Sequence, residues 1–231
     1  METPLVSLAD TVLQLAGRLE ALLAQQASER ILIALAGVPG SGKTTVSQAL
    51  LAELSIRHIH DVAVVPMDGF HYSKAVLSTF PDPELAFRRR GAPFTFDAEA
   101  FVALVKAIKK MPVTSLDESE QFLYAPSFDH AVKDPVPAAI PISSHNRLII
   151  IEGNYTLLDQ KPWKEIVTLC EEKWFVDVEK DLVKTRLAQR HLLAGIETSA
   201  LAAMKRAEEN DLPNGDLIRS LLIKPDIIIH N

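Results

Sequence analysis

Continuous apolar runs mark five segments of the chain as buried β-strands. The runs are short and lack the alternation of a strand with one wet face, so they fit strands that are covered on both faces of a parallel sheet. They occupy residues 31–36, 62–65, 148–151, 174–178 and 227–229.

Apolar residues at helical spacing fill the intervals between several of these runs. Such patterns cover about 43–54, 97–109, 163–171 and 179–193, and another follows Thr198. Strands that alternate with helices need crossover connections, which favour parallel strands with helices on both faces. The pattern therefore predicts a three-layer α/β fold around a five-stranded parallel sheet.

The remaining stretches bear on domain organisation. Apolar residues recur at helical spacing over 5–27, so residues 1–30 are expected to form an N-terminal helical extension that packs on the domain. Pro135, Pro137 and Pro141 predict an irregular excursion from the sheet rather than a domain boundary. A chain of 231 residues without an internal repeat is expected to form one domain over 1–231.

The first apolar run leads into a glycine-rich stretch that matches G-x-x-x-x-G-K-[ST] at every fixed position. Glycines there let backbone N–H groups turn inward at the positive end of the next helix, which makes an anion site. Lys43 can reach β- and γ-phosphates, and the Thr44 hydroxyl can hold Mg²⁺. The sequence thus predicts a P-loop NTPase fold whose phosphate loop consists of Gly37, Val38, Pro39, Gly40, Ser41, Gly42, Lys43, Thr44 and Thr45.

Composition limits the classes of partner that the chain is expected to bind. The chain has 24 basic and 30 acidic residues, a net charge of −6, and no long basic run, so it is a poor candidate for nucleic-acid or acidic-membrane binding. Cys170 is the only cysteine, which excludes an intrachain disulfide and a multi-cysteine zinc site. No apolar run is long enough for a membrane span, and no leader pattern is evident, so a cytoplasmic location is expected.

Two carboxylates follow predicted strands, where ligands of open α/β sheets bind. Asp68 follows the second strand and could accept a proton from a hydroxyl that attacks the γ-phosphorus; the alternative is a structural cap of the turn before Gly69. Glu152 ends the run 148–151 and fits an acidic group linked to Mg²⁺, directly or through water; the alternative is a structural salt bridge.

Arginines form two groups. The adjacent Arg88, Arg89 and Arg90 cannot all face one ligand, and they either face solvent or bind an anionic substrate. Arg186 and Arg190 share one face of a predicted helix and could close over the γ-phosphate, so about 180–215 is expected to form a lid and the helix after it. A solvated helix face is the alternative.

Two polar stretches carry local signals. Asp97 is placed to cap the helix that begins at Ala98. Residues 210–214, with the sequence NDLPN, have turn chemistry and are expected to end a helix, in a role that is either structural or adjacent to the nucleotide.

Together, GVPGSGKT, MDGFH, RRGAPFTFD, YAPSFDH, IIIEGNY and RLAQRHLLAG resemble the P-loop kinases that include uridine kinase, phosphoribulokinase and bacterial-type pantothenate kinase, and most closely a uridine kinase-like, nucleoside/nucleotide kinase-like branch. The resemblance spans nearly all of 31–231. It implies ATP, Mg²⁺ and phosphorylation of a small molecule's hydroxyl. By position, Asp68 matches the catalytic aspartate, Glu152 the strand-end acid, and Arg186 and Arg190 the lid arginines.

The resemblance also implies an acceptor pocket around His71, Tyr72, Arg89, Tyr124 and His130. YAPSFDH departs from the P-x-Y-D/S-H pattern of better known relatives, and the prolines after it indicate a different acceptor wall. Uridine-like nucleosides, pantothenate and sugars therefore all stay open as acceptors.

We accordingly expect an ATP-dependent small-molecule kinase in which Lys43, Asp68, Arg186 and Arg190 act in catalysis. The alternatives are an ATPase that transfers phosphate to water, and a nucleotide-binding regulatory protein without turnover. Asp68 distinguishes a kinase from a nucleotide-binding regulatory protein, because a protein that only binds nucleotide needs no base beside the γ-phosphate. Relatives are often dimers or tetramers, which leaves a homo-oligomer open.

Overall fold

A parallel sheet of five strands forms the centre of the computed structural model, which describes residues 7–26 and 28–231. The strand order is β2-β5-β1-β6-β7, and every neighbouring pair is parallel. The strands are β1 (Ile31–Gly37), β2 (Val62–Pro66), β5 (Leu148–Glu152), β6 (Glu172–Asp177) and β7 (Ile227–His230). The five predicted strands and their parallel arrangement are thus confirmed.

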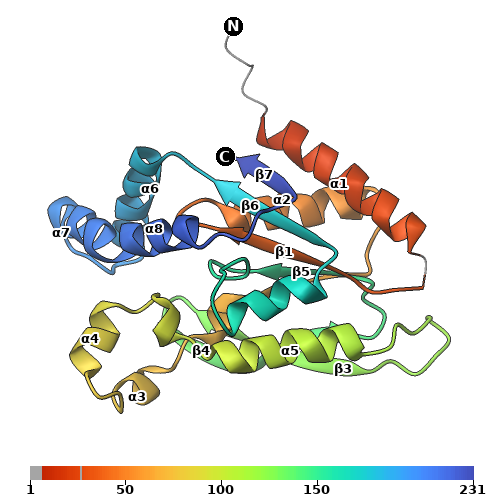
Figure 1. Cartoon of the computed structure of the whole chain (residues 1–231), viewed down its shortest axis with the longest axis horizontal. Helices are drawn as coiled ribbons and strands as arrows, with labels where there is room; N and C mark the ends of the chain where they lie inside the picture. The colour runs from red at the N-terminus through yellow and green to blue at the C-terminus, as the bar shows by residue number, and fades with distance from the viewer. Residues whose placement is uncertain (1–6, 27) are drawn as a thin grey trace, which may run out of the picture.

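Successive residues of the central strands face two separate cores, which explains why the runs are apolar throughout. Leu32 and Ala34 of β1 belong to one core, and Ile31 and Ile33 belong to the other. Helices α1 (Leu8–Gln25) and α2 (Lys43–Ile56) cover the second core, and α5 (Ala98–Lys110) covers the first on the opposite side of the sheet (Figure 1). The three-layer prediction is confirmed.

The helices follow the predicted ranges with two qualifications. Helix α1 occupies most of the predicted 5–27, and residues 5, 6 and 27 lie outside the described residues. Asp97 caps α5 as predicted, because its side chain accepts from the Ala100 N–H at 3.0 Å. The pattern at 163–171 is not an α-helix but a 3₁₀ helix, η3 (Trp163–Leu169), in which Trp163 and Ile166 are buried.

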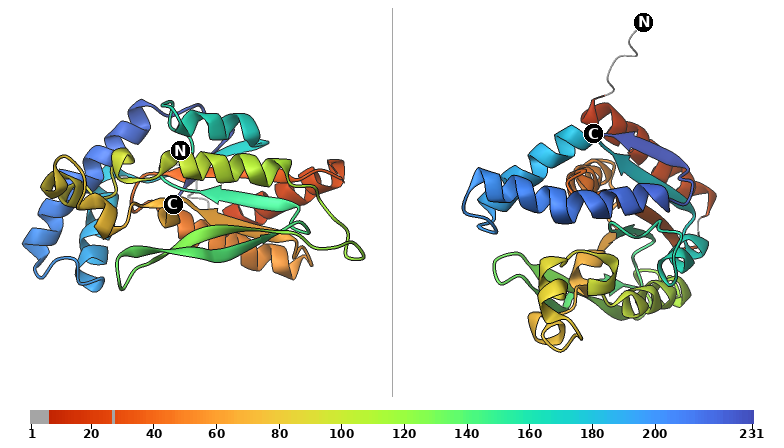
Figure 2. Two further views of the ribbon diagram at one scale, coloured as in Figure 1. Left: turned by 90° about the horizontal axis from the view of Figure 1, so that it is seen from below. Right: turned by 60° about the vertical axis from the view of Figure 1, so that its left-hand side comes forward.

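The proline-rich segment is a strand, contrary to the predicted irregular excursion. Strands β3 (Phe122–Asp129) and β4 (Asp134–Ser143) form an antiparallel hairpin that is separate from the main sheet (Figure 2). The hairpin has only two strands, so each prolyl nitrogen can face away from the partner strand without breaking a ladder bond. A register shift between Ala125 and Ser127 kinks the pair.

The sequence NDLPN was predicted to end a helix, and this prediction is wrong. The segment lies inside a helix. Helix α6 (Lys180–Leu193) is followed by α7 (Ala200–Arg206), a π-helical turn η4 (Ala207–Asp211) and α8 (Leu212–Ser220) without a break after Ala200. Pro213 lies just after the π turn, and the wider spacing of that turn accommodates a residue that has no N–H to donate.

Helices α6, α7 and α8 gather at the same end of the molecule as the short helices α3 (Lys74–Leu77) and α4 (Pro83–Arg88) (Figure 1). Two 3₁₀ helices, η1 (Met67–Phe70) and η2 (Pro93–Thr95), connect this group to β2 and α5. The first turn of α2 follows β1 here, so this end holds the carboxyl ends of the strands and the expected ligand site.

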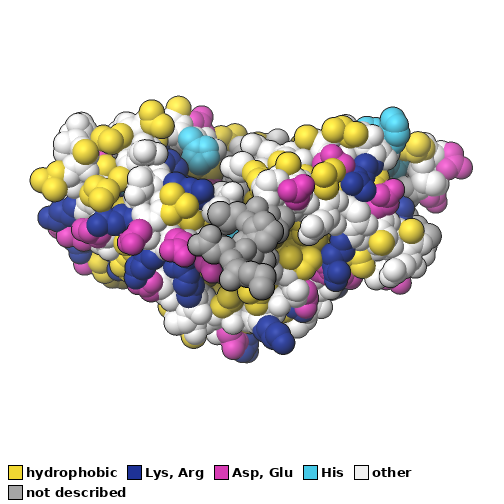
Figure 3. All heavy atoms as spheres, turned by 90° about the horizontal axis from the view of Figure 1, so that it is seen from above, with side chains coloured by type: hydrophobic (Ala, Val, Ile, Leu, Met, Phe, Trp, Pro, Cys, Tyr) yellow, Lys and Arg dark blue, Asp and Glu magenta, His cyan; other side chains and the backbone are white. Residues whose placement is uncertain are grey.

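Charged side chains of both signs are interspersed on the face shown in Figure 3. That distribution agrees with a formal charge of −6 made of many residues of each sign. None of the helices in the described part of the chain is long and apolar enough to cross a membrane.

Candidate active site

The predicted phosphate loop connects the end of β1 to the start of α2. Gly42 is the N-cap of α2 and has a φ of +89°, in the left-handed region where a side chain would be strained. Helix α2 begins at Lys43, so the amide groups of its first turn have no intrahelical acceptor and remain available to an anion. The strand–loop–helix context that the motif requires is present.

Lys43 reaches back across this loop. Its Nζ donates to the Gly37 and Val38 carbonyl oxygens at 3.1 and 3.2 Å and to Asn154 Oδ1 at 2.6 Å. Burial lowers the pKa of the Lys43 ammonium group to about 8, against the opposing effect of nearby Glu152 and Asp68. The three oxygens that accept from Lys43 are neutral, so an anion bound in the loop would meet a positive charge that these hydrogen bonds do not balance.

Glu152 joins the end of β5 to the first turn of α2. Its carboxylate accepts hydrogen bonds from Thr44 Oγ1 at 2.7 Å and Ser47 Oγ at 2.8 Å, and the residue is only 8% exposed. A hydroxyl and a carboxylate beside a phosphate loop form the oxygen donor set that suits Mg²⁺, which takes few protein ligands and completes its shell with phosphates and water. The residues present thus fit the predicted metal.

Asp68 lies on η1 directly after β2, at the same end of the sheet. A Cβ on the next residue, Gly69, would lie 2.0 Å from the Pro126 carbonyl oxygen, so the hairpin packs tightly on η1. His71 Nδ1 lies 2.8 Å from the Asp68 carbonyl oxygen. Burial lowers the pKa of His71, so the imidazole is neutral near pH 7.

A cavity of about 870 Å³ connects these groups. It contains residues from the phosphate loop, η1, the hairpin, the end of β5 and helix α6, so it spans both the nucleotide end and the hairpin wall. The predicted site residues that line it are Pro39, Gly40, Lys43, Thr44, Asp68, His71, His130, Glu152 and Arg190.

Four of the site residues predicted beyond the phosphate loop lie outside this lining. Arg186 donates to the Asn231 carbonyl oxygen at 3.4 Å, and Tyr72 packs edge-on against Phe80. Tyr124 is 54% exposed and stacks on Phe122. Arg89 points to Asn210 and Asn214, with donor–acceptor distances of 3.2 Å. The structure does not bring these four side chains to the cavity.

Arg90 takes the place next to the cavity that was expected of Arg89. Its guanidinium lies 5.5 Å from the ring centroid of Phe128 and donates to Asp134 Oδ1 at 3.0 Å. His71 packs between Phe128 and Phe96, with ring-centroid distances of 4.8 and 3.9 Å. Phe128 of the hairpin, Arg90 and His71 therefore form an aromatic and cationic wall that the sequence did not reveal.

The π-helical turn supplies a second wall that was missed. Asn210, Asp211 and Asn214 are each at least nine-tenths buried and line the cavity. Asp211 Oδ2 lies 2.8 Å from Nε2 of the buried His191, and its other oxygen lies 3.9 Å from Arg190. The signal in the sequence was NDLPN. A π turn rotates the residues that follow it relative to an α-helix, and this brings the polar residues of NDLPN to one side.

The phosphate loop, the parallel sheet and the acidic groups at its carboxyl end define a P-loop kinase. The Phosphoribulokinase / Uridine kinase family matches residues 32–197, and the chain belongs to this family. This confirms the family resemblance of the sequence motifs.

Individual relatives agree. "Putative uridine kinase C227.14" from Schizosaccharomyces pombe is 40% identical over 202 residues, which cover 87% of this chain and 83% of that protein. The "ATP-dependent kinase YFH7" of Saccharomyces cerevisiae is 35% identical over 197 residues, 74% of this chain and 56% of that protein. A crystal structure described as a "putative fructose transport system kinase", from Silicibacter sp. TM1040, has a TM-score of 0.78 at 35% identity and covers 96% of this chain and 98% of its own.

Proposed function

We propose that the protein transfers the γ-phosphate of ATP to a hydroxyl group of a small molecule. One observation carries the proposal: Asp68 shares a single cavity with Lys43 and Glu152 of the phosphate-binding end. A site that only bound nucleotide would not need a carboxylate and an enclosed space beyond the phosphates. The family and the relative named as an ATP-dependent kinase support ATP as donor.

Each residue has a defined task in this reaction. The loop amides and Lys43 bind the β- and γ-phosphates. The oxygen of the acceptor hydroxyl bonds to the γ-phosphorus while the bond from the γ-phosphorus to the bridging oxygen of ADP breaks, and Asp68 accepts the proton of that hydroxyl. Arg190, a 58% exposed side chain on α6, neutralises charge on the transferred group when the helix closes. Thr44 and Glu152 would hold Mg²⁺, which supplies further charge neutralisation.

The acceptor is a nucleoside, a sugar or a related hydroxyl compound. The names of relatives point in different directions, since one refers to uridine and another to fructose transport. The direct test is ADP release by the purified protein with a panel of nucleosides, sugars and pantothenate. At least one compound should raise ADP release above the rate with water alone. A rate that no acceptor increases would leave an ATPase or a nucleotide-binding protein as the better description.

ATP binding should take up a proton at a pH of about 8.5. Lys43 is then mostly neutral in the free protein, because its pKa is about 8, and the phosphates raise that pKa toward the ordinary lysine value of about 10.4. ATP adds no proton change of its own there, since phosphate groups have a second pKa of about 6. Calorimetry in two buffers with different ionisation enthalpies measures the uptake, which should be about half a proton or more per ATP.

Lys43→Arg is the matched control for this measurement. A guanidinium group stays charged throughout this range, so its ATP binding should take up no proton. Equal uptake by the wild type and Lys43→Arg would show that another group titrates. The wild-type uptake should also be much smaller near pH 7, where Lys43 is already mostly charged in the free protein and the phosphates of ATP are still mostly deprotonated.

A further inference from the structure

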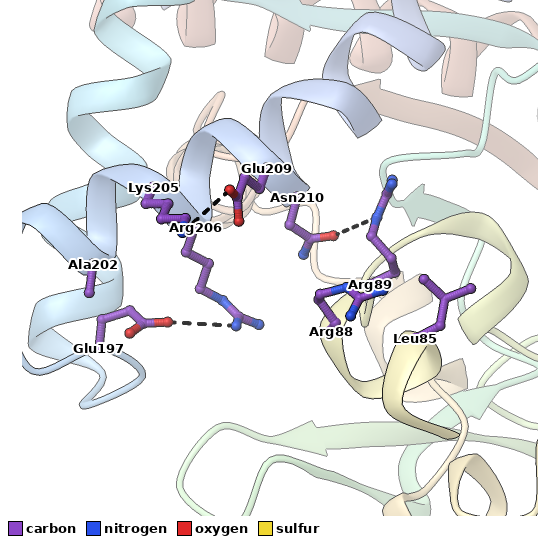
Figure 4. Close-up of a pocket in the computed structure, with 9 residues that line it drawn as sticks. All are labelled: Leu85, Arg88, Arg89, Glu197, Ala202, Lys205, Arg206, Glu209 and Asn210. Carbon is purple, nitrogen blue, oxygen red and sulfur yellow. Dashed lines mark hydrogen bonds and ion pairs between the residues drawn. The ribbon is translucent and has the colours of Figure 1, made fainter. Parts of the chain in front are cut away.

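A second cavity, of about 450 Å³, lies between helix α4 and the α7–η4 segment. We refer to it as the side cavity. Figure 4 shows Arg88 and Arg89 on the α4 side and Arg206 extending toward them from the helix opposite. The charged side chains of its lining are Arg88, Arg89, Lys205, Arg206, Glu197 and Glu209.

Positive charge exceeds negative charge in this lining, with four cationic side chains against two carboxylates. The carboxylates are loosely engaged: Glu197 lies 3.7 Å from Arg206, and Glu209 lies 3.8 Å from Lys205. Both distances exceed those of ordinary hydrogen bonds, and the second pair is well exposed, so neither pair is strong. The guanidinium of Arg206 is thus available to a better anionic partner.

Arg89 adds a further cation, whose hydrogen bonds in the described structure go to neutral groups. Its two hydrogen bonds go to the neutral amide oxygens of Asn210 and Asn214. Among residues 7–26 and 28–231, no carboxylate lies within ion-pairing distance of Arg89. These bonds hold its guanidinium at the wall of the side cavity, where an oxyanion could supply the negative charge that the neutral asparagine oxygens lack.

The side cavity adjoins the main cavity. Arg206 and Asn210 line both, so an acceptor in the main cavity can present an anionic group to the Arg206 guanidinium at the boundary between the two cavities. Lys43 and Arg190 are committed to the phosphates of the donor in the proposed reaction. The cations of the side cavity have no such role and lie toward the α4 side of the acceptor space.

We infer that the side cavity binds an anionic group, a phosphate or a carboxylate, carried by the acceptor. The inference rests on the proposed kinase function and narrows its substrate class to hydroxyl compounds that already bear such a group. Planar guanidinium groups favour both anions, because each presents paired oxygens that match their donors. Neutral nucleosides and free sugars carry no charge that could interact with these cations.

Steady-state kinetics with matched acceptors tests the inference. Each neutral compound is compared with its charged counterparts: glycerol with glycerate and glycerol phosphate, fructose with fructose phosphate, and uridine with uridine monophosphate. The carboxylate and phosphate arms show which anion is used. An anionic member should give the higher kcat/KM, and Arg206→Gln should raise its KM about tenfold or more, as expected for loss of one charge-assisted hydrogen bond.

Two further variants separate a specific role from a folding defect. Arg88→Gln with Lys205→Gln changes only residues that line the side cavity and should raise the same KM while leaving kcat unchanged. Lys110→Gln, at the exposed end of α5, should change neither parameter. A neutral acceptor that is preferred, or an anionic one whose KM is the same in all variants, would overturn the inference and leave the kinase function intact.

A binding measurement covers the case in which no compound in the panel is turned over. With a non-hydrolysable ATP analogue filling the phosphate loop, inorganic phosphate should bind saturably to the wild type and to Lys110→Gln, and at least about tenfold more weakly to Arg206→Gln. Saturable binding without any turnover would support the anion site while the proposed function fails. No saturable binding to the wild type would overturn the inference.

Discussion

Asp68→Asn should lower acceptor-dependent ADP release by about 10² to 10⁴-fold, the usual contribution of a positioned general base. Asparagine keeps the size of the side chain and its place on η1, but it cannot accept the hydroxyl proton. ATP binding should be nearly unchanged, because the phosphate contacts come from the loop and from Lys43. The measurement is the initial rate with the best acceptor, corrected for the rate without one.

Asp216→Asn is the matched control for Asp68→Asn, since this exposed carboxylate on α8 pairs with Lys180 outside the cavity lining. Its rate should equal that of the wild type. An acceptor-dependent rate that survives in Asp68→Asn would remove Asp68 as the base while leaving the kinase function intact. A large loss of ATP affinity would instead place Asp68 at the nucleotide.

The fold was readable from the sequence wherever burial on both faces forces a continuous apolar run. Strands β1 and β5 are entirely buried, and no polar residue interrupts them before their carboxyl ends. Strand β4 carries no comparable signal, because the hairpin has much exposed surface and tolerates three prolines. The position of the hairpin depends on the packing of β3 against η1, which is a contact between segments far apart in the chain.

The site was readable only where its chemistry is local in sequence. The phosphate loop is one continuous motif, and Asp68 and Glu152 each follow a recognisable strand. The choice between Arg89 and Arg90 could not be made in the same way, because it depends on how α4 turns toward the hairpin and the π turn. NDLPN misled for a related reason: turn-forming residues also fit a π turn, and only tertiary contacts with His191 and Arg89 decide between the two.

Lys43→Ala should lower kcat by about 10² to 10³-fold or more. This is the usual effect of removing one preorganised hydrogen-bond donor that stabilises the negative charge of the transition state. The ammonium group of Lys43 is the cationic side chain of the phosphate loop, and it is already held over the loop by the Gly37 and Val38 carbonyl oxygens. The fold should be retained, since burial disfavours the charged form of Lys43 and removing it relieves that cost. Circular dichroism and ADP release together measure both parts.

Stability against pH provides an independent check on Lys43→Ala. The folded pKa of about 8 lies below the unfolded value, so between the two the unfolded chain holds the proton more strongly, and Lys43 adds a rise with pH to the free energy of unfolding of the wild type. Burial raises the pKa of the Cys170 thiol and contributes with the opposite sign, so the rise is measured as the difference between the wild type and Lys43→Ala. Lys43→Ala lacks this rise, and Lys110→Ala, at the exposed end of α5, should keep it. Parallel pH profiles for the wild type and Lys43→Ala would contradict the burial of a titrating ammonium group. A Lys43→Ala protein that unfolds outright would shift the kinetic test to Lys43→Met, which keeps the aliphatic packing and removes only the charge.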